Sequence, residues 1–157
     1  MGFATFCFLT WLATALFVVL PKQLSLIENT FVYLVIMIFS INFSWIFIEE
    51  YHFMELTKNG MKYTAYLLVR SVLLPMLLII YLNFLQKVHK RPTIILITAA
   101  SIGIMIGVTY LSTFFNILEY RRWNHTYDAV YILLLHLLAV SSLKLIKKVS
   151  ESAVKYT

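Results

Sequence analysis

Hydrophobic residues fall into five long runs along the chain, separated by short polar segments. The runs cover about residues 3–20, 30–48, 64–85, 93–118 and 129–146. Each is close to the roughly 20 mostly apolar residues that a helix needs to cross a bilayer. Apolar residues follow one another within the runs and do not alternate with polar ones, which argues against the strands of a membrane barrel. The pattern predicts an all-α fold, an integral membrane bundle of five transmembrane helices.

The composition agrees with this prediction. The chain has 157 residues, of which 61% are hydrophobic and 13% charged, and its mean hydropathy is +0.84. Globular domains are about 45–50% apolar and about 25% charged. Only three prolines and four glycines are present, so flexible linkers and a second domain are not expected. We therefore expect a single transmembrane domain over residues 1–157.

The basic residues predict an orientation, because five spans place the two termini on opposite sides of the membrane. One side would hold Lys22, Lys87, Lys90, Arg91, Lys144, Lys147, Lys148 and Lys155, and the other would hold Lys58, Lys62, Arg121 and Arg122. The side richer in Lys and Arg is normally cytoplasmic. The N-terminus is thus predicted outside and the C-terminus in the cytoplasm, in the inner membrane of a cell. The basic C-terminal tail suits contact with anionic lipid headgroups of the bilayer, and no nucleic acid partner is expected.

Arg70 breaks the apolar pattern of the third run. It either extends toward the outer headgroups or turns inward and pairs with a carboxylate. Pro75 follows five residues later and has no N–H to offer the carbonyl of Ser71, which favours a kink. A charge, a hydroxyl and a freed carbonyl within two turns would suit a ligand. The carboxylates predicted at a similar depth are Glu49, Glu50, Glu119 and Asp128.

Polar side chains in the other spans have two interpretations. His136 lies in the middle of the last run, where a hydrogen bond to a neighbouring helix or a role in proton transfer would explain it. Asn42, Asn83 and Asn116 have the same alternatives, an interhelical hydrogen bond or a ligand contact. The predicted ligand or ion pathway comprises Arg70, Ser71, His136, Asn116 and Asp128.

The fourth run contains a stripe of small residues. Ala99, Gly103 and Gly107 recur at every fourth position and so share one face of a helix. Small residues at this spacing let two helix backbones approach closely in a membrane. We expect this helix to lie at the centre of the bundle or at a self-association face.

Carboxylates and histidines gather at the predicted outer ends of the spans. Glu49 and His52 have the spacing that places two metal ligands on one helical face. Glu119 and His125, with Asp128, come from the opposite outer loop, so a site for zinc, manganese or iron is one hypothesis. A surface salt network with the nearby Lys and Arg residues is the other. Tyrosine and tryptophan residues here indicate an aromatic belt at the membrane boundary.

Two segments carry a resemblance to other proteins. The stretches "VRSVLLP" and "FNILEYRRWNHTYDAVYILLLH" are similar to small multi-spanning membrane proteins of uncharacterised function in spore-forming Gram-positive bacteria. The resemblance implies a bacterial inner-membrane protein and no known activity.

The function is left with three hypotheses. The chain has no phosphate-binding loop, dinucleotide fingerprint, zinc-protease motif or serine-hydrolase motif, so we expect no cofactor. The first hypothesis is a non-enzymatic accessory subunit, stabiliser or sensor that packs against another membrane protein or itself. The second is a small transporter or channel component that uses Arg70, Pro75 and His136. The third is a membrane enzyme with the outer metal site.

Overall fold

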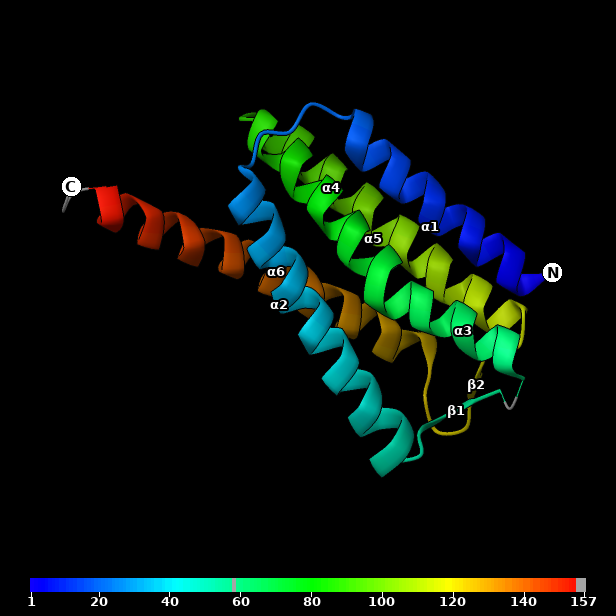
Figure 1. Ribbon diagram of the computed structural model, residues 1–157. Coiled ribbons are helices and arrows are strands. Elements are labelled where there is room, and N and C mark those ends of the chain that lie inside the picture. Colours follow the sequence, from blue (N-terminus) through cyan, green and yellow to red (C-terminus); the bar gives the residue numbers. More distant parts are fainter. Residues whose placement is uncertain (58, 155–157) are drawn as a thin grey trace.

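The computed structural model describes residues 1–57 and 59–154, and most of them lie in helices (Figure 1). The elements are α1 (Gly2–Val19), α2 (Leu26–Trp45), η1 (Ile46–Glu50), β1 (Met54–Leu56), α3 (Gly60–Leu68), η2 (Val69–Leu73), α4 (Leu74–Lys87), α5 (Arg91–Phe114), β2 (Leu118–Tyr120) and α6 (His125–Val154). The elements η1 and η2 are single π-helical turns that continue α2 and join α3 to α4. Lys58 and Lys155 of the predicted charge map lie outside the described residues.

Five helices in the described part of the chain are long and apolar enough to cross a membrane. They are Gly2–Val19, Leu26–Glu50, Gly60–Lys87, Arg91–Phe114 and His125–Ser150. The prediction of an all-α fold with five such helices is therefore confirmed. The multi-pass membrane character rests on the same five helices.

The ends of these helices follow from local side-chain chemistry. Ser25 and Glu28 form a reciprocal capping box at the start of α2, and the Asn59 side chain accepts backbone N–H bonds at the start of α3. The predicted fourth run extends to residue 118, but α5 ends at Phe114. The reason is the backbone of Asn116. Its φ of 50° lies in the left-handed region, so the helix cannot continue through this residue.

The span formed by α3, η2 and α4 is the centre of the bundle. In its most apolar stretch 56% of the residues are buried, against 11% for α5. Helix α1 packs on α3 and α4, α2 packs on α4 and α6, and α5 packs on α4 and α6. Helix α5 therefore lies at the edge of the bundle, and the expectation that it could be central was wrong.

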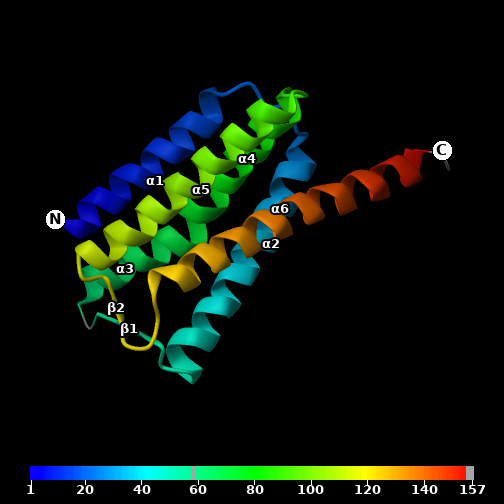
Figure 2. The same ribbon diagram turned by 180° about the vertical axis from the view of Figure 1, so that it is seen from behind.

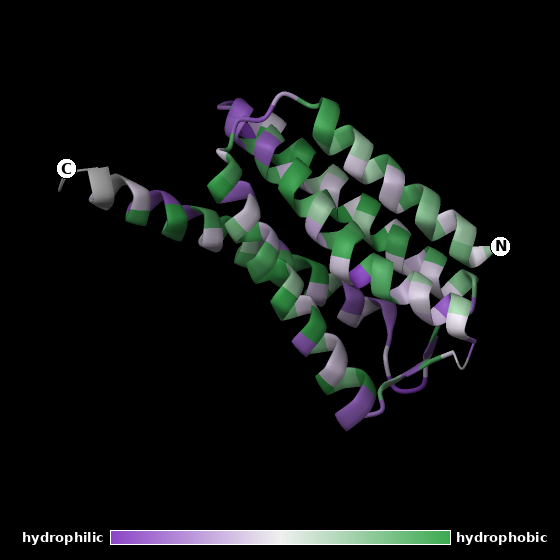
Figure 3. Ribbon diagram, viewed as in Figure 1, coloured by the Kyte–Doolittle hydropathy of each residue, from purple (hydrophilic) through white to green (hydrophobic). Residues whose placement is uncertain are grey.

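A short antiparallel ladder joins two connections at one end of the bundle. Strand β1 follows α2, strand β2 follows α5, and Glu55 pairs with Glu119 at the middle position. The N-terminus lies at this end, whereas the α1–α2 and α4–α5 connections lie at the other (Figures 1 and 2). The last turns of α6 project beyond that second end. Hydrophilic residues gather at both ends and apolar residues cover the helices between them (Figure 3).

Candidate functional site

A cavity lies inside the bundle near the strands. Its volume is about 60 Å³, measured as the space that the centre of a water molecule can reach. On that measure one water molecule needs about 10–15 Å³, so the cavity has room for a few waters or one small ion. Its wall comes from α2, α3, η2, α5, α6 and both strands, and includes Ser44, Tyr66, Arg70, Ser112, Asp128 and Tyr131.

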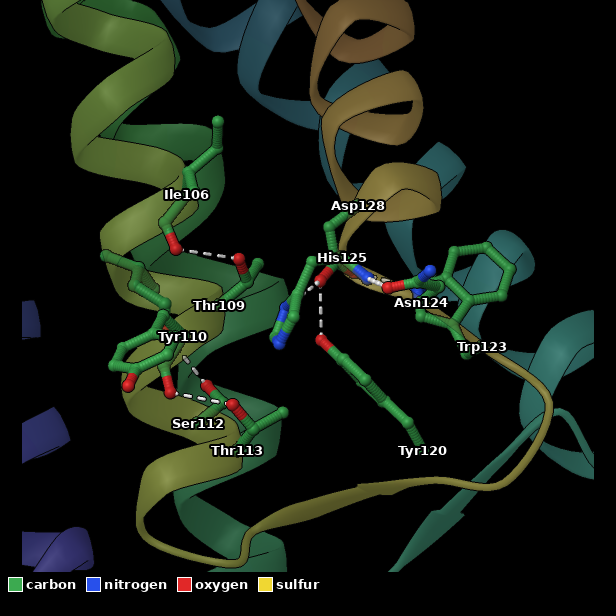
Figure 4. A network of polar contacts seen from close by, with 11 residues as sticks. Ile106, Thr109, Tyr110, Ser112, Thr113, Tyr120, Trp123, Asn124, His125 and Asp128 are labelled. Atoms are coloured by element: carbon green, nitrogen blue, oxygen red, sulfur yellow. Dashed lines mark hydrogen bonds and ion pairs between the residues drawn. The ribbon is translucent and has the colours of Figure 1, made fainter.

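Asp128 is the acidic group of this cavity and is only 6% exposed. The Tyr120 hydroxyl donates to its Oδ2 at 2.6 Å, and the Trp123 indole N–H donates to its Oδ1 at 2.8 Å (Figure 4). The Nδ1 atom of the exposed His125 lies 3.4 Å from Oδ2. Asp128 also lies in the first turn of α6, where the helix dipole favours a negative charge. Its carboxylate oxygens are thus well supplied with donors.

The surroundings of Tyr120 change the pKa of its hydroxyl. Burial raises the pKa of its hydroxyl above the ordinary value, and the hydrogen bond to Asp128 raises it further. Both effects act in the same direction because a phenolate would be poorly solvated here and would face a carboxylate. Tyr120 therefore stays a hydrogen-bond donor to Asp128.

Arg70 is the basic group of the same cavity. Its guanidinium carbon lies 5.4 Å from the centroid of the Tyr66 ring, a cation–π distance. Its Nε atom is buried and has no hydrogen-bond partner. Within the described residues the ion pairs join Arg121 to Glu55 and His125 to Asp128, so Arg70 has no carboxylate within 4.0 Å. Arg70 turns into the bundle, and of the four carboxylates considered from the sequence only Asp128 lines its cavity.

The carbonyl freed by Pro75 is used within the protein. The Tyr33 hydroxyl of α2 donates to the Ser71 carbonyl at 2.8 Å. The π-helical turn η2 immediately precedes Pro75, and such turns are a known source of helix kinks. The carbonyl of Ser71 thus connects two spans and is not left free for a ligand.

His136 makes an interhelical hydrogen bond in the middle of its span. Its Nε2 lies 3.0 Å from the Ser101 hydroxyl of α5, and its Nδ1 lies 2.8 Å from the Ile132 carbonyl. Because a carbonyl only accepts, we assign the ring proton to Nδ1, and Nε2 then accepts from Ser101. Both ring nitrogens are occupied, and the ring edge packs on Tyr81.

The asparagines have three different surroundings. Asn83 of α4 donates to the Asn29 side chain of α2 at 2.9 Å, an interhelical bond. The Asn42 amide donates to the Ile38 carbonyl of its own helix. Asn116 ends α5, and its carbonyl lies 3.5 Å from the Lys62 ammonium. Of the predicted pathway, Arg70 and Asp128 line one cavity, whereas His136 and Asn116 make contacts elsewhere.

The residues of the predicted metal site do not form one cluster, although His125 and Asp128 lie beside each other. Glu49 is exposed on η1, and His52 is exposed in the segment that follows it. Glu119 is exposed on β2, beside Glu55 of the other strand, and Glu55 forms a 2.7 Å ion pair with Arg121. Among the described residues, no three His, Cys, Asp or Glu side chains are grouped as a metal ion would require.

The small-residue stripe faces away from the bundle. Ala99, Gly103 and Gly107 are all exposed on α5. A Cβ atom added at Gly103 or Gly107 would meet no other atom within 4 Å. Within the described part of the chain, these glycines therefore make no close contact with another segment.

The sequence did not reveal the partners of the cavity charges. The tyrosine and tryptophan residues at this end of the bundle were expected only in an aromatic belt. Tyr66 instead contacts Arg70, and Asp128 accepts hydrogen bonds from Tyr120 and Trp123. Tyr120 comes from a strand that the sequence did not predict. The sequence did contain one signal of the bond to Asp128, because Trp123 has an indole N–H donor and precedes Asp128 by five residues.

Comparison with protein families, with curated proteins and with solved structures gives no match for this chain. The resemblance to membrane proteins of spore-forming bacteria therefore stays a prediction.

Proposed function

We propose that this protein is a non-enzymatic accessory subunit in a membrane complex, and that α5 packs against a spanning helix of another membrane protein. The observation that supports this proposal is the outward stripe on α5. Ala99, Gly103 and Gly107 are exposed, and the two glycines have open space above them.

The way in which helices associate in bilayers explains why such a stripe favours contact with another helix. Lipid tails are as apolar as leucine, so helices associate through close van der Waals packing and polar contacts. Glycine weakens a helix by about 1 kcal/mol relative to alanine. In α5 the two glycines gain no compensating contact from their own chain. A helix from another protein, packed into this flat surface, would supply it.

The other two hypotheses have weaker geometric support. Of the polar residues proposed for transport, Arg70 lines the cavity with Asp128, whereas His136 lies in a separate network and both of its ring nitrogens are occupied. The carboxylates and histidines of the enzyme hypothesis form no cluster of three in the described residues.

The proposed orientation places the N-terminus outside and the C-terminus in the cytoplasm of a bacterial cell. Lys22, Lys87 and Arg91 lie at the end of the bundle beyond which α6 projects, and Arg121 and Arg122 lie at the end with the strands. The positive-inside rule supports this orientation.

The test is gentle extraction at native expression level, followed by native mass spectrometry. We expect a complex with a second polypeptide for the wild type, and loss of that complex in Ala99→Leu and in Gly103→Leu. The added side chain at Gly103 would not disturb the fold, because it meets open space. The matched control is Ala4→Leu, which adds the same bulk to an exposed position of α1.

Each outcome has a definite meaning. A complex that is lost in both stripe variants and kept in the control supports the proposal. A monomeric wild type, or a complex that survives Gly103→Leu, would overturn it. A homo-oligomer that dissociates in the stripe variants would confirm a helix contact but overturn the accessory role.

A further inference from the structure

The cavity between α2, η2 and α6 contains one basic and one acidic side chain with unequal hydrogen bonding. Asp128 receives hydrogen bonds from Tyr120 and Trp123 and lies beside His125. The buried Nε of Arg70 has no partner. Among the described residues that line the cavity, the cation Arg70 therefore has an unused hydrogen-bond donor, whereas the carboxylate of Asp128 already accepts hydrogen bonds. What the cavity lacks is an acceptor.

Charge adds to this imbalance. Arg70 lies ten residues into a spanning helix, at a depth where an unpaired arginine is costly and is normally compensated by a partner. Its guanidinium contacts the Tyr66 ring, which offsets part of that cost. Its distance from every carboxylate of the described residues exceeds 4.0 Å, so the charge is not neutralised by direct pairing.

The size of the cavity limits the ligand. About 60 Å³ of space for water centres accommodates one small ion with a few waters. A larger apolar groove of about 520 Å³ shares Phe43, Trp123 and Tyr131 with this cavity and has Arg122 in its wall. The groove lies between α2 and α6, so an acidic group of a membrane lipid is a second source of the same chemistry.

We propose that this cavity binds a small monovalent anion, of the size of chloride or formate, and that the Arg70 guanidinium is its principal ligand. The hydroxyls of Ser44 and Tyr66, which line the same space, supply further donors. The site is separate from the exposed stripe of α5, so the anion proposal does not depend on the proposed accessory role.

The experiment measures the melting temperature of the full chain in nanodiscs of neutral phosphatidylcholine. Sodium chloride, sodium formate and sodium gluconate are compared at equal ionic strength, because gluconate is too large for the cavity. We expect a saturable rise in melting temperature with chloride and formate and none with gluconate. The rise is lost in Arg70→Gln and kept in Arg122→Gln, which removes an exposed arginine from the neighbouring groove.

A second variant keeps the test decisive if Arg70→Gln does not fold. Arg70→Lys preserves the charge but removes the planar array of donors. Since a hydrogen bond to a charged group changes affinity by about tenfold or more, we expect half-saturation at a roughly tenfold higher anion concentration. Equal melting temperatures in the three salts, or the same response in Arg70→Lys as in the wild type, would overturn the proposal.

The source of the anion is distinguished by lipid composition. Nanodiscs that contain phosphatidylglycerol offer a lipid phosphate in place of a free anion. If chloride and formate stabilise the protein in neutral lipid, a small free anion is the ligand. Stabilisation by phosphatidylglycerol alone, without any response to the free anions, would overturn the small-anion proposal in favour of a lipid acidic group.

Discussion

At the scale of single residues, Asn83 shows how one polar side chain connects distant parts of a membrane protein. Its Oδ1 accepts from the backbone N–H groups of Gln23 and Leu24, and its Nδ2 donates to the Asn29 side chain and to the Ile79 carbonyl. Every polar atom of the amide is satisfied at a site only 6% exposed. This network fixes the α1–α2 connection to α4.

Asn83→Ala should therefore destabilise the protein by about 2–3 kcal/mol, because it leaves the Gln23 and Leu24 N–H groups and the Oδ1 atom of Asn29 without these partners. Asn42→Ala is the matched control, since the exposed Asn42 bonds only to a carbonyl of its own helix. Reversible unfolding in mixed micelles measures both. Equal losses of unfolding free energy in the two variants would show that the Asn83 network does not specifically stabilise the fold.

Tyr120 gives a dependence on pH. Its pKa is raised by burial and by Asp128, so the folded state favours the neutral phenol more than the unfolded state does. Its stabilising contribution is complete below the ordinary tyrosine pKa of about 10 and is lost as pH rises above that value. We expect the melting temperature to fall less steeply above pH about 10 in Tyr120→Phe than in the wild type. Parallel curves for the two proteins would contradict this assignment.

The sequence located the polar residues of the spans but not their partners. Arg70 and His136 were visible as exceptions in apolar surroundings, and Asp128 was expected in the outer loop before the last run. Their contacts come from segments far away in the chain, as in the bond between Ser101 and His136. Such pairs depend on how the helices pack, and a single sequence does not encode that packing in any local pattern.

At the scale of elements, the span of α3, η2 and α4 shows how a proline is accommodated. Pro75 offers no N–H to Ser71, and the hydroxyl of Tyr33 from α2 bonds that carbonyl instead. The proline thus exchanges a bond within one helix for a bond between two. Sequence reasoning identified the freed carbonyl, but not the tyrosine that uses it.

A double-mutant cycle tests this exchange. Tyr33→Phe should cost about 1 kcal/mol in the wild type, the usual net value of a hydrogen bond. The same change should cost clearly less in Pro75→Ala, where the restored N–H is available to Ser71. The free energy of unfolding of the four proteins gives the coupling, and a coupling of zero would show that Tyr33 and Pro75 act independently.

The strands and the end of α5 show where sequence patterns fail for elements. Strands β1 and β2 have only three residues each, too few for an alternating pattern to be recognised. Residues 115–118 continue the apolar run beyond α5, so hydropathy placed the helix end too late. The left-handed backbone of Asn116 is the physical cause, and asparagine is one of the few residues that adopt it readily.

At the scale of the whole molecule, hydropathy was sufficient to predict five helices but not their neighbours. All five runs became helices that are long enough to span. The small-residue stripe lies on a face of α5 that points out of the bundle. A stripe of this kind indicates close packing without saying whether the partner is internal or external.

The orientation is testable by thiol labelling in a Cys7→Ala background, which removes the only cysteine. Arg122→Cys lies at the end with the strands, and His89→Cys lies in the α4–α5 connection; both positions are exposed. In intact bacterial cells a membrane-impermeant maleimide should label Arg122→Cys, and it should label His89→Cys only after lysis. The reverse pattern would place the N-terminus in the cytoplasm.

If the exposed face of α5 contacts another membrane protein, photo-crosslinking in living cells will capture that contact. A photoreactive amino acid replaces Ile106, which is exposed beside Gly103 and Gly107, or replaces Val18 on the exposed side of α1 as the control. We predict one discrete protein adduct from position 106, its loss when Gly103→Leu is added, and no such adduct from position 18. Lipid adducts alone from both positions would contradict the account.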